Sequence, residues 1–111
     1  MEISFATKRL ARELADDRAL SRAYGDRAKR LKLRLDFLAV AACLDDVPPA
    51  PPTRRHELTG EWVGHFAVDI TANWRLIFRP NHNPIPRVAN GGVDLKAITA
   101  IEIVAIEDYH S

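Results

Sequence analysis

A proline-rich segment near the middle of the chain separates two parts that are built differently. The residues from Asp45 to Pro52 include four of the seven prolines in 111 residues. Proline lacks the amide donor that a helix needs, and it disfavours helical geometry in the residue before it. Any helix that reaches this segment must therefore end there. The segment predicts a stiff connector between an N-terminal part and a C-terminal part with different elements.

The N-terminal part predicts one short strand and two helices. Residues 2–6 alternate polar and apolar side chains, as a strand does. Helical spacing follows from Lys8 to about Tyr24, with one apolar face made by Leu10, Leu14 and Ala15. Gly25 is expected to end this helix, and Asp26 is expected to cap the N-terminus of the next one.

The second predicted helix carries a broad apolar face. One set of apolar residues recurs at helical spacing and consists of Ala28, Leu31, Leu35, Leu38 and Ala42. A second set lies beside it and consists of Leu33, Phe37, Val40 and Leu44. Because the second set widens the apolar face toward the connector, we expect the C-terminal half of this helix to be better buried than its beginning.

Three strands are predicted after the connector. Apolar side chains alternate in three ranges, which run from Gly64 to Ile70, from Trp74 to Phe78 and from Ala97 to Ile106. In the last range, the residues expected on one face are Ile101, Ile103 and Ala105. Residues 71–73 predict a tight hairpin turn, and the Pro/Asn/Gly-rich residues 80–92 predict an irregular, mobile loop.

The order of these elements predicts an α+β fold. A strand and two helices precede a run of antiparallel strands, which places the two N-terminal helices on one face of a small curved, mostly antiparallel sheet. A chain of 111 residues is long enough for one hydrophobic core and too short for two. We therefore expect residues 1–111 to form a single domain.

Charge and cysteine content limit the partners and the surroundings of the chain. The first 34 residues hold ten Lys or Arg and only five Asp or Glu. This basic region suits an anionic partner such as RNA or an acidic protein, although a solvated helix face explains the same charges. Cys43 is the only cysteine and is expected in the core. The sequence shows no apolar run of about 20 residues and no signal-peptide pattern, so we expect a cytoplasmic protein without a membrane span.

Side chains suited to acid–base chemistry stand at or near the ends of the predicted strands. They are His56, Arg75, Asp108, Tyr109 and His110. Judged by residue type alone, His56 is a surface histidine, and Arg75 is a solvent-facing strand residue paired with Asp69 across the hairpin. On the same view, the residues near the C-terminus form a frayed end.

The spacing of these residues resembles that of a known protein family. The motif His56-x-Leu58-x-Gly60 is followed by Gly64, an aromatic strand, Asn73-Trp-Arg75, and finally Asp108-Tyr109-His110. In this order and at these separations, the residues resemble the HigB-type toxins of the RelE/ParE superfamily, which are host-killing proteins of bacterial type II toxin–antitoxin systems. The resemblance covers most of the chain and implies a RelE-like fold.

The resemblance implies a ribosome-dependent endoribonuclease that cleaves mRNA. It also implies a hetero-oligomer with a cognate antitoxin of the helix-turn-helix class. RNA is cleaved when its 2′-hydroxyl is deprotonated and attacks the neighbouring phosphorus. The reaction needs a base, positive charge at the phosphate and an acid at the departing 5′-oxygen. None of these requires a metal or a cofactor, so we expect neither.

This chemistry assigns a role to each candidate residue. Arg75 is permanently charged and suits the charge that develops at phosphorus. On a terminal strand, Asp108 and His110 point to one face and Tyr109 points to the other. We therefore assign the acid–base pair to His110 together with either Asp108 or His56. Tyr109 is assigned to orienting a base or the backbone, and the direction of proton transfer stays open.

One departure from the family pattern bears on activity, and another concerns a loop. Many HigB-type toxins have a lysine where this chain has Thr59, and Arg54 and Arg55 are the candidates to replace it as RNA-binding cations. The loop at residues 80–92 is longer than in compact members and is a candidate contact for the antitoxin or the ribosome. Two alternative functions also remain: a ParE-like toxin that inhibits DNA gyrase without cleaving RNA, and a disabled module that only binds an antitoxin.

Overall fold

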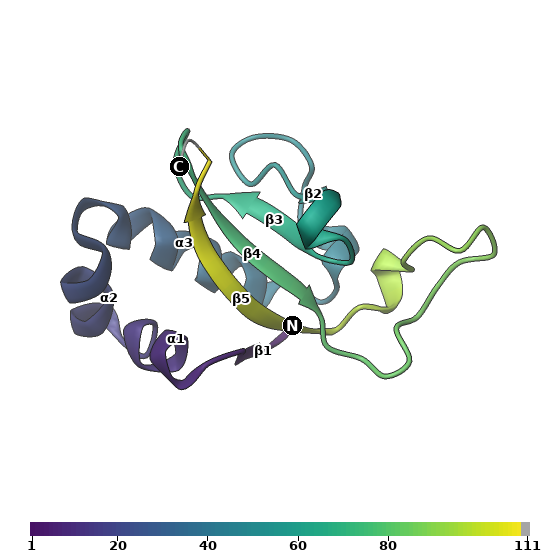
Figure 1. The fold of residues 1–111 in the computed structure, drawn as a ribbon, viewed down its shortest axis with the longest axis horizontal. Helices are drawn as coiled ribbons and strands as arrows, with labels where there is room; N and C mark the ends of the chain where they lie inside the picture. The colour runs from purple at the N-terminus through teal and green to yellow at the C-terminus, as the bar shows by residue number, and fades with distance from the viewer. Residues whose placement is uncertain (110–111) are drawn as a thin grey trace.

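The described residues, 1–109, form a five-stranded sheet with helices against one face, shown as a computed structural model in Figure 1. The strands are β1 (Glu2–Phe5), β2 (His56–Glu57), β3 (Phe66–Asp69), β4 (Trp74–Pro80) and β5 (Ala100–Asp108). They lie in the order β1-β5-β4-β3-β2. β1 is parallel to β5, and the other neighbouring pairs are antiparallel. The predicted α+β class with a mostly antiparallel sheet is confirmed.

The first predicted helix is in fact two helices, α1 (Lys8–Glu13) and α2 (Asp17–Tyr24). Asp16 stands between them in an extended conformation. Its Oδ1 accepts a hydrogen bond of 2.8 Å from the amide of Ala19, which caps the N-terminus of α2. The prediction of one continuous helix was wrong because the side chain of Asp16 satisfies a backbone amide and so starts a new helix.

The long helix α3 (Ala28–Val40) lies behind the sheet in Figure 1. Asp26 was expected to cap it but lies in a 3-10 turn, η1 (Gly25–Arg27). Arg27 occupies the N-cap position, and no side-chain hydrogen bond caps this end. The helix also ends earlier than expected, and Leu44 belongs to a separate 3-10 turn, η2 (Leu44–Asp46). The η1 turn leads directly into α3 and takes the place of a side-chain cap.

The expectation that the C-terminal half of α3 is the better buried half was wrong. Leu31 and Leu38 are in the core, whereas Leu33, Phe37 and Val40 are 54%, 44% and 86% exposed. At 100° per residue, the exposed set points to the side of the helix opposite the core. Leu33, Phe37 and Val40 therefore form a face separate from that of Leu31 and Leu38, whereas Leu44, which was expected with them, lies beyond the helix and is buried in the core.

The helices pack on one face of the sheet around buried strand residues. Those on β3, β4 and β5 are Phe66, Val68, Leu76, Phe78, Ile101 and Ile103. This agrees with the alternation of apolar side chains predicted for the ranges that contain β3 and β4. The hairpin predicted at residues 71–73 is also confirmed, because the amides of Ile70 and Thr71 donate to the carbonyl of Trp74 at 2.8 and 3.2 Å.

A β-bulge reverses the faces of β5 near its C-terminal end. The ladder pairs on either side of it are Phe78 with Ile103 and Ile77 with Ala105. Val104 is the inserted residue, so alternation starts again beyond it. The residues that then point away from the helices are Ala105, Glu107 and Tyr109. The prediction that Ala105 shares a face with Ile101 and Ile103 was wrong, because the bulge adds one residue between them.

The face of the sheet away from the helices is partly covered by β2 and the turn η3 (Gly60–Trp62). Leu58 packs there with Ala67 and Ile77 in a second apolar cluster. β2 was not predicted, since two residues are too few to show an alternating pattern. Gly60 and Gly64 have φ angles of 65° and 86°, which residues with a Cβ rarely adopt, and both help the chain to turn at this point.

The connector is fixed to the rest of the molecule by hydrogen bonds. Thr53 is buried, its Oγ1 donates to the carbonyl of Pro48 at 2.9 Å, and its own carbonyl accepts from the amide of Asp69 at 2.8 Å. These bonds attach the connector to the end of β3.

Residues 81–99 extend from the sheet on the right of Figure 1, away from α1 and α2. They contain an isolated bridge between Arg87 and Val93 and a 3-10 turn, η4 (Leu95–Ala97). The irregular loop is confirmed, and its mobility stays a prediction. Cys43 is half-buried and so less enclosed than expected. Within residues 1–109, none of the helices is long and apolar enough to cross a membrane.

Candidate functional site

A pocket of about 390 Å³ lies where the connector meets β2, the end of β3 and the end of β5. Its lining residues include Arg54, Arg55, His56, Asp69 and Tyr109. Four of these five were predicted as functional residues from the sequence. The sheet brings them together because β2, β3, β4 and β5 are neighbours in that order.

Asp69 connects the parts of this pocket. Its Oδ1 accepts a hydrogen bond of 2.6 Å from the hydroxyl of Tyr109, and its Oδ2 lies 3.5 Å from Nε of Arg54. Its backbone carbonyl accepts a hydrogen bond of 2.6 Å from Nε of Arg34 on α3. One residue at the end of β3 thus holds Tyr109, Arg54 and the long helix α3.

Arg75 is stacked against Tyr109 and is largely buried. Its guanidinium carbon lies 4.7 Å from the centre of the Tyr109 ring, within the range of a cation–π interaction. Its Nη2 lies 3.2 Å from Oε1 of Glu107, which is directly opposite in the ladder, and its side chain is 17% exposed. The carboxylate paired with Arg75 therefore belongs to Glu107 and not to Asp69, the partner considered from the hairpin.

Aromatic rings stabilise two arginines that each have a buried guanidinium nitrogen without a hydrogen-bond partner. Among the described residues, Nε of Arg75 and Nε of Arg27 are the buried side-chain nitrogens without a hydrogen-bond partner. Arg27 stacks on Trp74 at 3.9 Å, as Arg75 stacks on Tyr109. The ring face attracts the cation and offsets part of its lost hydration. Tyr109 therefore stabilises the positive charge of Arg75 at its buried position.

His56 is an exposed histidine that lines the pocket. Its Nδ1 lies 2.8 Å from the carbonyl oxygen of Arg54. Because a carbonyl oxygen can only accept a hydrogen bond, the neutral ring must carry its hydrogen on Nδ1. Nε2 then has a lone pair that can take a proton, which is the form that a general base needs.

Tyr109 serves the pocket as a donor and not as a base. Burial, together with the hydrogen bond to Asp69, raises the pKa of Tyr109 to about 12. The nearby charges of Arg75 and Arg54 lower this pKa to a smaller extent. The hydroxyl is therefore protonated at neutral pH, which agrees with the orienting role assigned to Tyr109.

The bulge in β5 separates Asp108 from the pocket. Asp108 lies opposite Trp74 in the ladder, and alternation turns it toward the helices, whereas Glu107 points to the other face. Asp108 therefore does not share a site with His56 or Arg75. His110, the other residue assigned to the acid–base pair, lies outside the described residues.

The two RNA-binding candidates differ in accessibility. The side chain of Arg54 is 64% exposed. Arg55 is half-buried, and its Nε donates to the carbonyl of Val47 at 2.8 Å, which commits part of its guanidinium to the connector. Thr59, where many HigB-type toxins have a lysine, is exposed at the start of η3. Arg54 is thus the more accessible cation.

Two carboxylates of the site, Asp69 and Glu107, were not predicted from the sequence. Asp69 was expected only as a partner for Arg75. Asp69 and Arg75 face each other across the hairpin, so strand pairing alone put Asp69 on the same face as Arg75. No local signal identified Glu107, because its face depends on the bulge at Val104.

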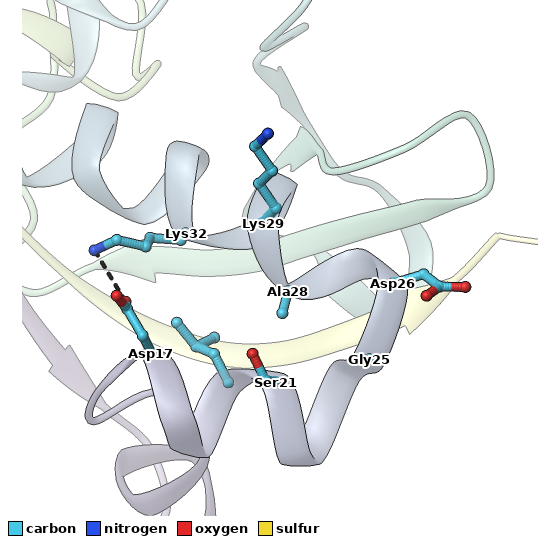
Figure 2. A pocket seen from close by; sticks show the side chains of 8 residues that line it. Asp17, Ser21, Gly25, Asp26, Ala28, Lys29 and Lys32 are labelled. Atoms are coloured by element: carbon cyan, nitrogen blue, oxygen red, sulfur yellow. Dashed lines mark ion pairs between the residues drawn. The ribbon is translucent and has the colours of Figure 1, made fainter.

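A second hollow, of about 310 Å³, lies between α2 and α3 and is shown in Figure 2. Lys32 of α3 extends to Asp17 of α2, with 3.3 Å between the charged atoms. Its lining includes no histidine or cysteine, so it lacks a group that transfers protons near neutral pH. Within residues 1–109, no group of three or more His, Cys, Asp or Glu side chains can hold a metal ion.

The fold resembles that of several solved structures. YafQ from E. coli strain BL21(DE3) is 14% identical, with a TM-score of 0.55 over 98% of this chain and 93% of that chain. The YoeB/ParE toxin from Agrobacterium tumefaciens is 13% identical, with a TM-score of 0.54 over 97% and 98% of the two chains. The YoeB–YefM complex from Staphylococcus aureus is 12% identical, with a TM-score of 0.54 over 96% and 94%. No protein-family model and no curated protein matches the sequence. Likeness at these identities shows a common fold.

Proposed function

We propose that this chain is a cytoplasmic toxin of a type II toxin–antitoxin system and an endoribonuclease of the HigB type within the RelE/ParE superfamily. The fold shared with a YoeB/ParE toxin supports the toxin role. The order of the motifs from His56 to His110 supports the HigB type. One observation carries the proposed activity: Arg54, His56 and Tyr109 converge on one pocket, with Arg75 stacked against Tyr109.

The charges of this pocket suit a phosphodiester. The ion pair between Arg54 and Asp69 is 3.5 Å long, and the arginine is exposed. Such a pair contributes little to stability, so a phosphate oxygen can replace Asp69 as the partner of Arg54. Arg55 lines the same pocket and adds a second cation from the residues between the connector and β2.

Cleavage begins when Nε2 of His56 takes the proton of the RNA 2′-hydroxyl. The 2′-oxygen attacks the neighbouring phosphorus, and Arg54 and Arg75 stabilise the additional negative charge. The bond from phosphorus to the 5′-oxygen then breaks, and the departing oxygen takes a proton from His110. The products are a 2′,3′-cyclic phosphate and a 5′-hydroxyl end. The acid role of His110 rests on its sequence motif alone.

Two partners belong to this proposal. The first is a cognate antitoxin of the helix-turn-helix class in a hetero-oligomer, and the shared fold with the YoeB–YefM complex supports a protein partner. The second is mRNA on the ribosome. The loop predicted at residues 80–92 belongs to the segment that extends away from α1 and α2, and it is the candidate contact for one of these partners (Figure 1).

The test is to induce the intact chain and its variants in bacteria and to map new mRNA 5′ ends, with and without blocked translation. His56→Gln is the central variant, and His65→Gln is its matched control. Nδ1 of His65 lies 3.2 Å from the carbonyl of Val63, as Nδ1 of His56 lies beside that of Arg54, but His65 does not line the pocket. We expect translation-dependent cuts from the intact chain and from His65→Gln, and none from His56→Gln.

The other possible results of this experiment would point to other residues or to other functions. Undiminished cleavage by His56→Gln would remove His56 from the mechanism. Growth arrest without cleavage would favour inhibition of DNA gyrase, and no arrest would favour a module that only binds an antitoxin. Cleavage that persists in His110→Ala would show that another group protonates the departing 5′-oxygen.

A further inference from the structure

We propose that the outward face of α3 binds a second copy of this chain, so that two molecules pair through antiparallel α3 helices about a twofold axis. This inference does not depend on the nuclease activity or on the antitoxin proposed above. It rests on the pattern of apolar and charged side chains along α3 and η2.

An apolar stripe runs along the outward face of α3. Leu33, Phe37 and Val40 are three of the five large apolar side chains that the described residues expose. Their spacing of four and three residues places them on one line of the helix, opposite the core. They line a groove of about 350 Å³ together with Asp36, Ala41 and Asp46. Adjacent exposed apolar side chains of this kind mark interaction surfaces.

The two ends of the stripe carry opposite charges. Lys29 and Arg30 precede it, and Asp45 and Asp46 follow it in η2, and all four are exposed. Figure 2 shows Lys29 extending away from α2, whereas Lys32 is engaged with Asp17. Within the described part of the chain, these four residues take no part in any ion pair. The basic end and the acidic end thus lack partners in the single molecule.

This surface is complementary to itself in one orientation. When two α3 helices lie antiparallel, Leu33 of one molecule faces Val40 of the other, and the two Phe37 side chains meet near the axis. The same arrangement brings the basic end of each stripe beside the acidic end of the other. An isologous twofold interface requires this reciprocity, in which one patch serves both partners.

The size of the surface indicates a dimer in exchange with the monomer. α3 has 13 residues, so it is about 20 Å long at a rise of 1.5 Å per residue. One helix pair of this length buries less than the roughly 1,200 Å² of standard stable interfaces. We therefore expect a transition from monomer to dimer that depends on protein concentration.

The first experiment is sedimentation velocity of the full chain over a range of concentrations. We expect the 12.5 kDa monomer at low concentration and a species of twice that mass at high concentration. Phe37→Asp should abolish the dimer, because it places a charge at the centre of the stripe. Val63→Asp is the matched control, since Val63 is 72% exposed outside the stripe and its replacement should leave the dimer unchanged. Circular dichroism establishes that both variants are folded.

A charge exchange tests the orientation. One variant carries Lys29→Glu and Arg30→Glu, and a second carries Asp45→Lys and Asp46→Lys. Like charges then face each other in each variant alone, so neither should dimerise. An equal mixture of the two should dimerise again, and Phe37→Asp in either partner should prevent it.

Three results would overturn the proposal. The first is an intact chain that remains monomeric at every concentration, which would leave this face to another protein. The second is a dimer that persists in folded Phe37→Asp. The third is a mixture of the two charge variants that stays monomeric, which would exclude the antiparallel arrangement.

Discussion

At the residue scale, the site depends on how one tyrosine and one carboxylate are placed. The Tyr109 hydroxyl lies 2.6 Å from Asp69, and its ring covers the guanidinium of Arg75. Arg75 in turn lies 3.2 Å from Glu107. The two arginines proposed to stabilise negative charge are therefore each held by a carboxylate before substrate arrives, and Tyr109 stands between them.

The tyrosines offer a direct measurement of this arrangement. The chain has two, and the pKa of each is raised, that of Tyr109 to about 12 and that of Tyr24 by burial and its hydrogen bond to Glu13. We expect a spectroscopic titration at 295 nm to show no tyrosine ionisation near pH 10 in the folded protein. Tyr109→Phe should remove the component near pH 12. A transition near pH 10 that is present in the intact, folded chain and absent from folded Tyr109→Phe would contradict the geometry at Tyr109.

The raised pKa of Tyr109 also predicts how stability depends on pH. An unfolded tyrosine has a pKa of about 10, so between about pH 10 and 12 the unfolded chain releases this proton first. The contribution of Tyr109 to stability is thus fully present below pH 10 and is lost as the pH rises through 12. Urea unfolding across this range should show a smaller loss in Tyr109→Phe than in the intact chain.

At the element scale, the bulge in β5 decides which side chains reach the pocket. Deleting Val104 should leave a regular ladder in which Ala105 still lies opposite Ile77, so Glu107 and Tyr109 keep their face. Deleting Ile106 should instead turn Tyr109 toward the helices. We expect the pKa of Tyr109 to stay raised in the first variant and to return to about 10 in the second. The same value in both folded variants would refute this account of the bulge.

Arg34 joins α3 to the site. Its Nε donates to the carbonyl of Asp69 at 2.6 Å, and its Nη2 donates to that of Pro52 at 3.4 Å. Arg34→Ala should lower the free energy of unfolding by about 1.5–3 kcal/mol, the range for hydrogen bonds of charged groups. Arg18→Ala, at an exposed position on α2, should change it by less than about 0.5 kcal/mol. Equal effects of the two in urea denaturation would show that Arg34 does not connect these elements.

At the scale of the whole molecule, α3 has two apolar faces, one buried in the core and one exposed. Leu31 is fully buried, and Leu33 is 54% exposed two residues later. Leu31→Ala should lower the free energy of unfolding by about 2–5 kcal/mol, because it leaves a cavity in the core. Leu33→Ala should change it by less than about 0.5 kcal/mol when measured on the monomer. A large loss in Leu33→Ala would mean that this face is covered within the single molecule.

Much of the fold followed from local patterns in the sequence. Prolines end a helix, alternation marks a strand and helical spacing marks a helix wherever they occur, so the order of elements and the α+β class were predictable. The wrong predictions concern the helices, where the pattern of apolar residues does not by itself fix where a helix begins or which side is buried. Asp16 divided the first helix, and the spacing of Leu33, Phe37 and Val40 gave the same helical signal as that of Leu31 and Leu38, although only Leu31 and Leu38 are in the core.

The candidate site was predictable in part. The sequence by itself determined that His56, Arg75 and Tyr109 belong to one spaced set of motifs, because residue type and separation are properties of the chain alone. Only the tertiary structure decided that Asp69 and Glu107 join them and that Asp108 does not. The physical reason is strand pairing: the face to which a side chain points depends on register with a distant strand. A single inserted residue at Val104 changes that register without a local signal.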